Sequence, residues 1–289
     1  MRFRAMNTDV TVIAERDEAE VAAQVEQLFA AAEQRFSRFR STSELSQLNR
    51  ATRPMIVSTP MFDALVAAKR YVELTDGIFE PAIGAALVAL GYDRSFLPGA
   101  LDRDTGGTAP RTASLLDVEL DPTCQLVTRP EGVQIDLGGI VKGRTVDAAA
   151  ALLPPRGAID AGGDQVLRGS DGWLVEIEDP RDAQQRIATV RVREAAVATS
   201  AANRRKWRVQ RAQRHHIVDP RTSRSAESDL EQVTVVAPTA ELADVLAKTV
   251  FVLGSEAGPV FLDRFSDVAA VLVPACGEPL VYGELEVVS

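Results

Sequence analysis

The sequence predicts an α+β fold of largely antiparallel sheets flanked by helices, and three observations indicate it. The 289 residues are 46% hydrophobic and 25% charged, a balance that suits a globular chain with a sizeable core. Apolar residues recur at helical spacing through much of the first part of the chain. Short strand-like runs then follow one another with few helices between them, which favours antiparallel pairing.

The first 96 residues are expected to form one strand followed by helices. The strand is expected at 3–14, where apolar and polar residues alternate. Ser41 and Glu44 stand at capping-box spacing and predict the start of a short helix. Pro60 is a favourable first helical residue. The predicted helices span residues 17–39, a short stretch after Ser41, 60–74 and 82–90.

Residues 97–114 are rich in glycine, proline and aspartate and predict a loop. We expect a single domain over 1–289, with this loop as a possible seam between a helix-rich sub-lobe, 1–96, and a strand-rich sub-lobe, 115–289. Three helices are expected in the second sub-lobe, at 140–153, 239–253 and 256–265. The predicted strands are LLDVEL, CQLVTR, VQIDLG, AIDAGG, DQVLRG, WLVEIE, QRIATVRV, AVATS, HHIVDP, EQVTVVAP, 268–273 and 279–282.

Charge and composition exclude several classes of protein. The net charge is -9, so there is no basic field for nucleic acid or anionic lipid. No apolar run reaches the ~18 residues of a membrane span, and the N-terminus has no apolar signal core. A cytoplasmic location and no membrane span are therefore expected. Cys124 and Cys276 stand far apart, which argues against a disulfide framework.

Two glycine pairs are candidate ligand sites. Gly138 and Gly139 lie between an expected strand and an expected helix, and Lys142 falls in the first turn of that helix. Free N–H groups at a helix start bind phosphate, and an anion would explain a cation at the positive end of the helix. A glycine turn with a solvated lysine explains the pattern equally well. For Gly162 and Gly163, a tight turn between strands is at least as good an explanation as a ligand site.

The stretch ELADVLAKTVFVLG, residues 241–254, carries one lysine in an apolar run. On a helix, Asp244 and Lys248 are i,i+4 neighbours on one face. Taken alone, the stretch favours an ion pair at the exposed start of a buried helix.

The order of these motifs resembles the ApbE family, the FAD:protein FMN transferases, over nearly the whole chain. The most specific blocks are IDLGGIVKGRTVD, DAGGD and HHIVDPRTS. The other matching blocks are AMNTDVTV, RFSRFRSTSELSQLN, DGIFEPAIGAALVALGY, AVATSA and VTVVAPTAELADVLAKTVFVLG.

The resemblance implies an ApbE-like fold with an FAD cleft between lobes. It implies transfer of FMN from FAD to a threonine or serine of an acceptor flavoprotein, with release of AMP and with Mg²⁺ at the pyrophosphate. Phosphoryl transfer depends mainly on positioning and charge neutralisation, which a cation and an ammonium supply.

The resemblance also assigns residues. It implies catalytic roles for Lys142 and Asp244. We add Lys248 as a catalytic candidate, because its ammonium could take the place of the metal ion. The resemblance implies metal ligation by the Ala161 carbonyl and the Asp244 carboxylate. It implies contacts with FAD for Met6, Thr8, Tyr92, Gly138, Gly139, Lys142, Gly162, Gly163, Ser200 and His216.

This chain departs from the family pattern at Lys248, where the family has a threonine that ligates the metal. Three interpretations stay open. Thr249 or water fills the metal shell; the Lys248 ammonium replaces the metal; or Lys248 disables metal binding. Asn7 and Ser223 stand where the family has glycine.

The departures leave a second class of function open beside the transferase. It is a non-catalytic FAD-binding or flavin-carrier protein. A scaffold that binds no flavin is a third.

Overall fold

The computed structural model describes residues 1–95, 102–103, 113–182, 184–203, 205–209 and 212–288. The chain divides into two compact units. The first comprises Met1–Ala30, Lys142–Asn203 and Ser228–Ser289, and the second comprises Ala31–Val141 and Arg204–Glu227. No boundary between the units falls in the predicted loop 97–114. Most of that loop lies outside the described residues, and the described pair Asp102–Arg103 forms a short strand, β4.

The first unit is built on an eight-stranded sheet in which every neighbouring pair is antiparallel, in the order β1-β2-β7-β8-β11-β16-β17-β18. A second sheet has the order β19-β10-β9. Helix α1 starts in this unit and α5 continues into it. The elements are β1 Arg2–Ala5, β2 Thr8–Ala14, α1 Glu18–Phe36, α5 Val141–Ala150, β7 Gly157–Ala161, β8 Asp164–Arg168, β9 Trp173–Glu178, β10 Arg186–Val192, β11 Ala195–Ala201, β16 Leu230–Ala237, α6 Ala240–Leu262, β17 Ala269–Pro274, β18 Leu280–Tyr282 and β19 Glu286–Val288. The predicted α+β class is confirmed.

The large sheet has a different core on each face. Ala196 packs in a cluster with residues of α5 and with Ala240 at the start of α6. Val197, the next residue of β11, packs instead with residues of β9 and β10. Side chains alternate between faces along a strand, so even-numbered residues of β11 face the helices and odd-numbered residues face the second sheet.

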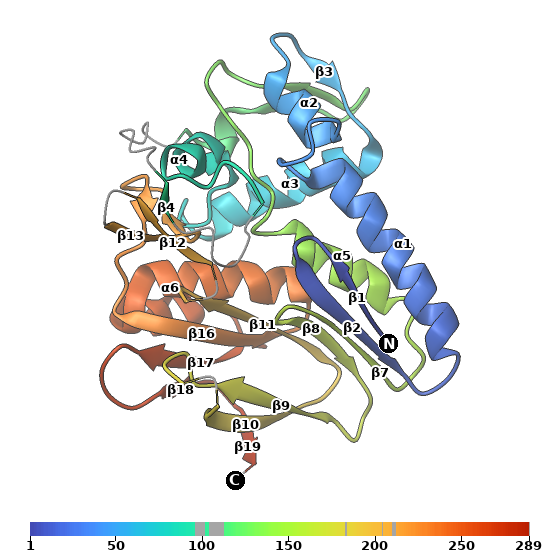
Figure 1. The fold of residues 1–289 in the computed structure, drawn as a ribbon, viewed down its shortest axis with the longest axis vertical. Coiled ribbons are helices and arrows are strands. Elements are labelled where there is room, and N and C mark those ends of the chain that lie inside the picture. Colours follow the sequence, from blue (N-terminus) through green and yellow to red (C-terminus); the bar gives the residue numbers. More distant parts are fainter. Residues whose placement is uncertain (96–101, 104–112, 183, 204, 210–211, 289) are drawn as a thin grey trace. The chain divides into compact units, whose positions relative to one another are not determined.

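Helix α6 is the core helix of this unit. It packs on β8, β11 and β16 and runs along them in Figure 1. By length and composition it could cross a membrane, yet 56% of its most apolar stretch is buried. Gly254, with φ +84°, breaks the helix, and Asp229 accepts a 2.9 Å hydrogen bond from the Ser255 amide just after the break. The two predicted helices 239–253 and 256–265 correspond to its two segments.

The predicted strand 3–14 is in fact a hairpin of β1 and β2. Met6 and Asn7 form its two-residue turn, with φ of +48° and +60°. Two positive φ angles in a row are what a type I′ turn requires, and they match the right-handed twist of the flanking strands. Alternation continues across so short a turn, so periodicity alone does not reveal it.

The second unit holds short helices and small sheets. Its elements are α2 Glu44–Arg50, β3 Met55–Ile56, α3 Thr59–Leu74, a 3₁₀ turn Pro81–Ile83, α4 Gly84–Ala89, β4 Asp102–Arg103, a 3₁₀ turn Leu115–Asp117, β5 Glu119–Asp121, β6 Leu126–Thr128, β12 Lys206–Val209, β13 Ala212–His215, β14 Val218–Asp219 and β15 Arg224–Ser225. The cap of α2 is Ser43, whose hydroxyl accepts from the Ser46 amide at 3.0 Å, and Ser41 is not the cap. The predicted strand VQIDLG is irregular chain.

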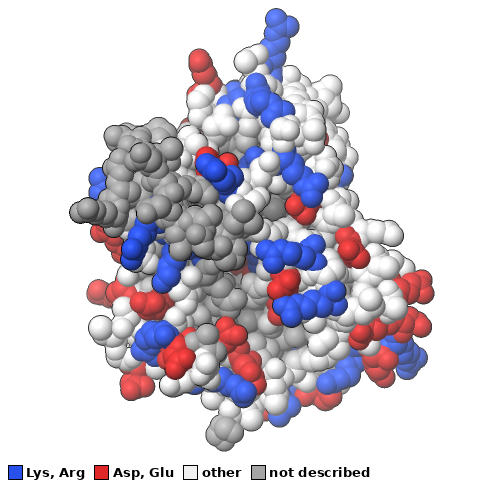
Figure 2. Space-filling view, in the orientation of Figure 1, with Lys and Arg blue, Asp and Glu red and all other residues white. Residues whose placement is uncertain are grey.

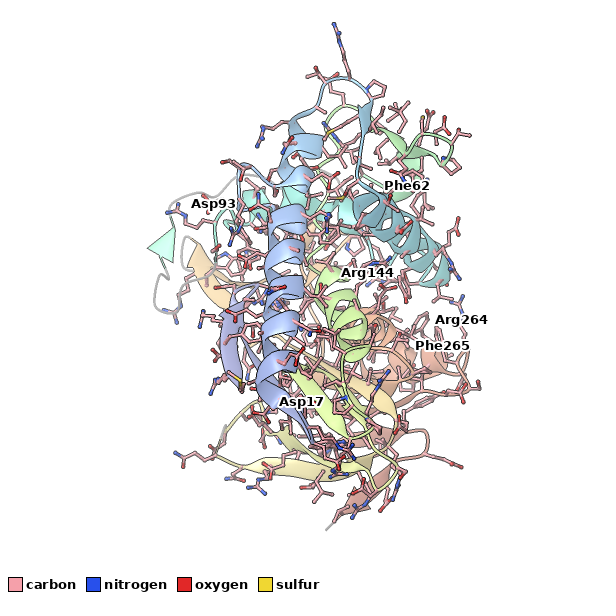
Figure 3. The ribbon with its side chains drawn as sticks, turned by 90° about the vertical axis from the view of Figure 1, so that its right-hand side faces the viewer. Asp17, Phe62, Asp93, Arg144, Arg264 and Phe265 are labelled. Carbon is pink, nitrogen blue, oxygen red and sulfur yellow. The ribbon has the colours of Figure 1, made fainter. Side chains whose placement is uncertain are left out.

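Helices α5 and α6 meet through three residues of α5. Arg144, labelled in Figure 3, pairs with Glu241 at 2.9 Å. Asp147 accepts hydrogen bonds from the amides of Ala240 and Glu241 at 2.8 and 2.9 Å, and so caps α6. Gly143 lies against the backbone of the same two residues. A close docking of two helices therefore fixes where α6 begins.

Replacing Gly143 by alanine should destabilise the protein by up to about 2 kcal/mol, the overpacking cost less the gain in helix propensity. Alanine normally stabilises a helix relative to glycine by about 1 kcal/mol, whereas overpacking costs about 1–3 kcal/mol. The added Cβ would lie 2.5 Å from the Ala240 carbonyl oxygen and 2.8 Å from the Glu241 Cα, and backbone atoms cannot move aside cheaply. Urea denaturation measures the change.

The matched control is Ala148→Gly at an exposed position of α5, which should cost about 1 kcal/mol through helix propensity alone. A Gly143→Ala variant more stable than the wild type would contradict the close docking of α5 on α6.

Candidate functional site

Lys142 lies in the first turn of α5, as predicted, and its side chain is largely buried, at 15% exposure. Its Nζ donates to the Ala161 carbonyl oxygen at 3.1 Å and forms an ion pair with Asp164. The predicted alternative of a solvated lysine is therefore wrong. The ammonium is held by a carbonyl at the end of β7 and a carboxylate at the start of β8.

The strand register brings these groups to the helix-covered face of the sheet. Asp164 is the cross-strand neighbour of Ala198 in β11 and of Ala161 in β7. Ser200 lies two residues beyond Ala198, so it shares that face and is buried, at 5% exposure. Thr199 points to the opposite face, where its hydroxyl lies 3.0 Å from that of Thr234.

Helix α6 presents a second ion pair. Lys248 pairs with Asp244 four residues earlier, as the helical spacing predicted. The pair does not lie at an exposed helix start, because the Asp244 side chain is 2% exposed and that of Lys248 is 20% exposed. The second carboxylate oxygen of Asp244, Oδ2, is buried and accepts no hydrogen bond from the described residues.

The two ion pairs interact with each other. Burial, and after it the negative charge of Asp244, raise the pKa of Asp164 to about 6, although the ammoniums of Lys142 and Lys248 oppose both effects. We call Lys142, Asp164, Asp244 and Lys248 the four-charge cluster. Its charges sum to zero, and three separate elements, α5, β8 and α6, supply them.

The turn between β7 and β8 lies against the hairpin that carries Thr8. Gly162 and Gly163 have φ of +62° and +98°, which glycine adopts without strain. A Cβ on Gly162 would lie 1.9 Å from the Thr8 hydroxyl oxygen. Thr8, Ala161 and the glycine pair are thus neighbours, as the resemblance implies, and the glycine leaves room for the threonine side chain.

The cluster does not fit a divalent metal ion. The Ala161 carbonyl and the carboxylates of Asp164 and Asp244 already serve two ammoniums. An ammonium has no lone pair and cannot ligate a cation. Unit charges about 4 Å apart repel by about 4 kcal/mol near a protein surface, so a divalent ion beside Lys248 meets repulsion on the order of 8 kcal/mol. Among the described residues no three acidic, histidine or cysteine side chains group as metal ligands.

Thr249 does not supply the missing metal ligand. Its side chain is fully buried, and its hydroxyl donates to the Val245 carbonyl oxygen of its own helix at 2.9 Å. The first interpretation of Lys248 therefore loses its Thr249 form, in which that hydroxyl completes a metal shell.

The second unit places the other predicted residues. Tyr92 is buried and stacks on Trp207, with ring centroids 5.3 Å apart. The Arg38 guanidinium lies 4.6 Å from the centre of the Tyr92 ring and pairs with Asp136. The Asp136 carboxylate also accepts from the amide of Gly138 at 2.6 Å. Tyr92 is therefore packed between Trp207 and Arg38. The Gly138 amide, predicted to bind phosphate, is already hydrogen-bonded to Asp136.

His216 follows β13 in the same unit and is half-buried. Its neighbour His215 contacts the Ala226 carbonyl at 3.0 Å, and burial lowers the pKa of His215 below its usual value. The flavin-contacting roles of His216, Ser200 and Met6 stay predictions.

Two departures from the family pattern keep a left-handed backbone. Asn7 has φ +60° and Ser223 has φ +55°, so the chain adopts at both a conformation that glycine favours. Asparagine tolerates this region better than serine.

Replacing Ser223 by glycine should therefore stabilise the protein by about 0.5–1 kcal/mol. A left-handed residue with a Cβ costs roughly 1–2 kcal/mol, and the greater freedom of glycine in the unfolded chain offsets part of the gain. Thermal denaturation measures the change. Ser223→Ala removes the same hydroxyl but keeps the Cβ, so stabilisation of equal size in that variant would show that backbone strain is not the cause.

Asp164 is the residue that the sequence argument passed over, although it directly follows the glycine pair. The available signal was a charged residue between a glycine pair and an apolar strand, because charged residues are rarely buried unless they are paired. Arg38 and Trp207 gave no comparable signal.

The face drawn in Figure 2 intersperses basic and acidic side chains. On this face the described residues form no broad basic field, which agrees with the net charge of -9.

An antiparallel sheet covered by helices, with two largely buried lysines paired to aspartates between them, defines an α+β protein with a charged internal cluster. The chain belongs to the ApbE family, whose model matches residues 6–272.

Named relatives and solved structures agree with this assignment. The chain is 32% identical to the FAD:protein FMN transferase of Treponema pallidum (strain Nichols), over 91% of this chain and 80% of that protein. It is 29% identical to that of Klebsiella pneumoniae (strain 342), over 89% and 83%. The ApbE protein of Thermotoga maritima shares the fold at a TM-score of 0.86 and 24% identity, over 98% of this chain and 96% of that one.

Proposed function

We propose that this protein is an FAD:protein FMN transferase, which attaches FMN from FAD to a threonine or serine of an acceptor flavoprotein. The single observation that carries the proposal is the Lys142 ammonium, held at the start of α5 by the Ala161 carbonyl and Asp164. Its place in the Gly-Gly-Ile-Val-Lys-Gly block matches the family lysine, and relatives named for this activity align over most of the chain.

The reaction breaks the phosphoanhydride bond of the FAD diphosphate and forms a phosphoester bond to the acceptor. The acceptor hydroxyl oxygen forms a bond to the phosphorus of the FMN half, and the bond from that phosphorus to the bridging oxygen breaks. AMP departs with the bridging oxygen, and the hydroxyl proton passes to solvent. The barrier falls when fixed positive charge neutralises the phosphate oxygens and the reactants are held in line.

The residues of this chain divide that work. The ammonium of Lys142 supplies positive charge at a helix start, where the dipole also favours an anion. Asp164 and the Ala161 carbonyl hold that ammonium in place. Mg²⁺, which the resemblance implies, enters no step here because the four-charge cluster does not fit it.

The test combines purified protein, FAD and an acceptor flavoprotein that a relative modifies. The expected result is flavin fluorescence on the denatured acceptor together with equimolar AMP. Replacing the target threonine of the acceptor by alanine should abolish both. FAD binding without AMP release would favour the flavin-carrier function, which the lysine at position 248 makes the specific alternative.

A further inference from the structure

We propose that the Lys248 ammonium is the cation of this site and that the protein binds the diphosphate of its dinucleotide without a divalent metal ion. The inference rests on the proposed function, because it concerns the same site and the same substrate. It selects the second of the three interpretations that the sequence left open for Lys248.

The Lys248 ammonium lies beside Asp244, the carboxylate that the resemblance assigns to the metal ion. Asp244 is the ion-pair partner of Lys248, and the Asp244 backbone carbonyl lies 3.5 Å from the Lys248 Nζ. An ammonium has three N–H donors and acts toward phosphate as a point charge. The side chain is 20% exposed, against 2% for Asp244, so the lysine reaches toward the surface while its carboxylate anchor stays inside.

Lys142 supplies a second ammonium to the same cluster. It binds the Asp164 carboxylate and the Ala161 carbonyl, and the resemblance assigns that carbonyl to the metal ion. These two lysines belong to a chain with only four, at positions 69, 142, 206 and 248. Two ammoniums converging on one buried cluster are therefore a specific feature of this site and not a consequence of lysine abundance.

The ligand chemistry follows from the pair of charges. Two ammoniums match two neighbouring phosphate groups, each with one negative charge, as in a dinucleotide diphosphate. Carboxylates behind the ammoniums fix their positions, and the side chain of Asp244 has a further oxygen, Oδ2, with no hydrogen bond from the described residues. That oxygen can accept another N–H of Lys248 as the ammonium turns toward a ligand.

The experiment is a titration of the metal-stripped full-length protein with FAD, followed by flavin fluorescence, in EDTA and in millimolar Mg²⁺. The wild type is expected to bind FAD with a Kd that changes less than about twofold between the two buffers, well inside the tenfold step that 1.4 kcal/mol represents. Lys248→Thr is expected to bind FAD at least about tenfold more tightly in Mg²⁺ than in EDTA. Lys248→Gln, which removes the charge and shortens the side chain by one atom, is expected to bind weakly in both.

Circular dichroism and a Mg²⁺ titration of the melting temperature accompany the binding curves, so that each variant is read only where it folds. If Lys248→Gln does not fold, the test is the melting temperature of Lys248→Thr, which Mg²⁺ is expected to raise. Wild-type binding that fails in EDTA and returns with Mg²⁺ would overturn the inference, and so would Lys248→Gln binding like the wild type in EDTA. A wild type that binds no FAD in either buffer would refute the proposed function itself.

Discussion

Replacing Lys248 by methionine is expected to lower the free energy of unfolding by about 3–5 kcal/mol, the usual cost of leaving one buried charge unpaired. Methionine keeps the apolar stem of the side chain, so the packing changes little. The Asp244 carboxylate, 2% exposed, loses the ammonium it pairs with. Asp164, whose side chain is equally buried, then shares the single ammonium of Lys142 with it. Guanidinium denaturation at neutral pH measures the change.

The charge balance of the cluster supplies the controls. Asp244→Asn leaves a surplus ammonium, but Lys248 is 20% exposed and can turn toward water, so this variant should lose less than Lys248→Met. The double variant Asp244→Asn with Lys248→Met restores neutrality and should recover most of the lost free energy, because removing both partners of a buried pair is often nearly neutral. Strictly additive losses would show that the two residues do not interact as a pair.

Much of the fold was predictable because the relevant signals are local. Pro60 predicted the start of α3. The helix ends at Leu74, directly before the turn-forming Thr-Asp-Gly sequence at 75–77. The break in α6 at Gly254 was visible as a glycine between two apolar runs. The hairpin at Met6 and Asn7 was not visible, because neither residue is glycine and the alternation of the strands continues through it. The interleaving of the two units in the chain likewise depends on tertiary contacts.

The candidate site was predictable in part for the same reason. Asp244 and Lys248 are four residues apart on one helix, so their pairing follows from spacing. The meeting of Lys142 with Asp164 depends on the register of β7, β8 and β11, which no local pattern fixes. Burial could not be predicted for either lysine. Lys142 was explicable as a solvated charge and Lys248 as half of an ion pair at an exposed helix start, whereas the packing of α5 and α6 on the sheet leaves their side chains 15% and 20% exposed.

Replacing Lys142 by glutamine is expected to lower the rate of FMN transfer by about 10²–10³-fold, the range seen when one preorganised charge-stabilising donor is removed from a transition state. Without this ammonium the phosphate oxygens face the carboxylates of Asp164 and Asp244 with Lys248 alone between them. Covalent flavin on the acceptor, measured over time at saturating FAD, gives the rate, and an FAD titration separates lost binding from lost chemistry.

The double variant Lys142→Gln with Asp164→Asn separates two roles of Lys142. If Lys142 served only to neutralise the buried Asp164, removing both charges would restore transfer as well as stability. If its ammonium acts on the phosphate, the double variant folds well and stays slow, since the neutral amide at position 164 needs no ionic partner while the substrate still does. Lys142 also donates to the Ala161 carbonyl, and the shorter glutamine side chain has N–H donors of its own, so circular dichroism of both variants checks that the fold around β7 is unchanged. The second outcome is the one expected, and it would place Lys142 on the substrate and Asp164 behind it.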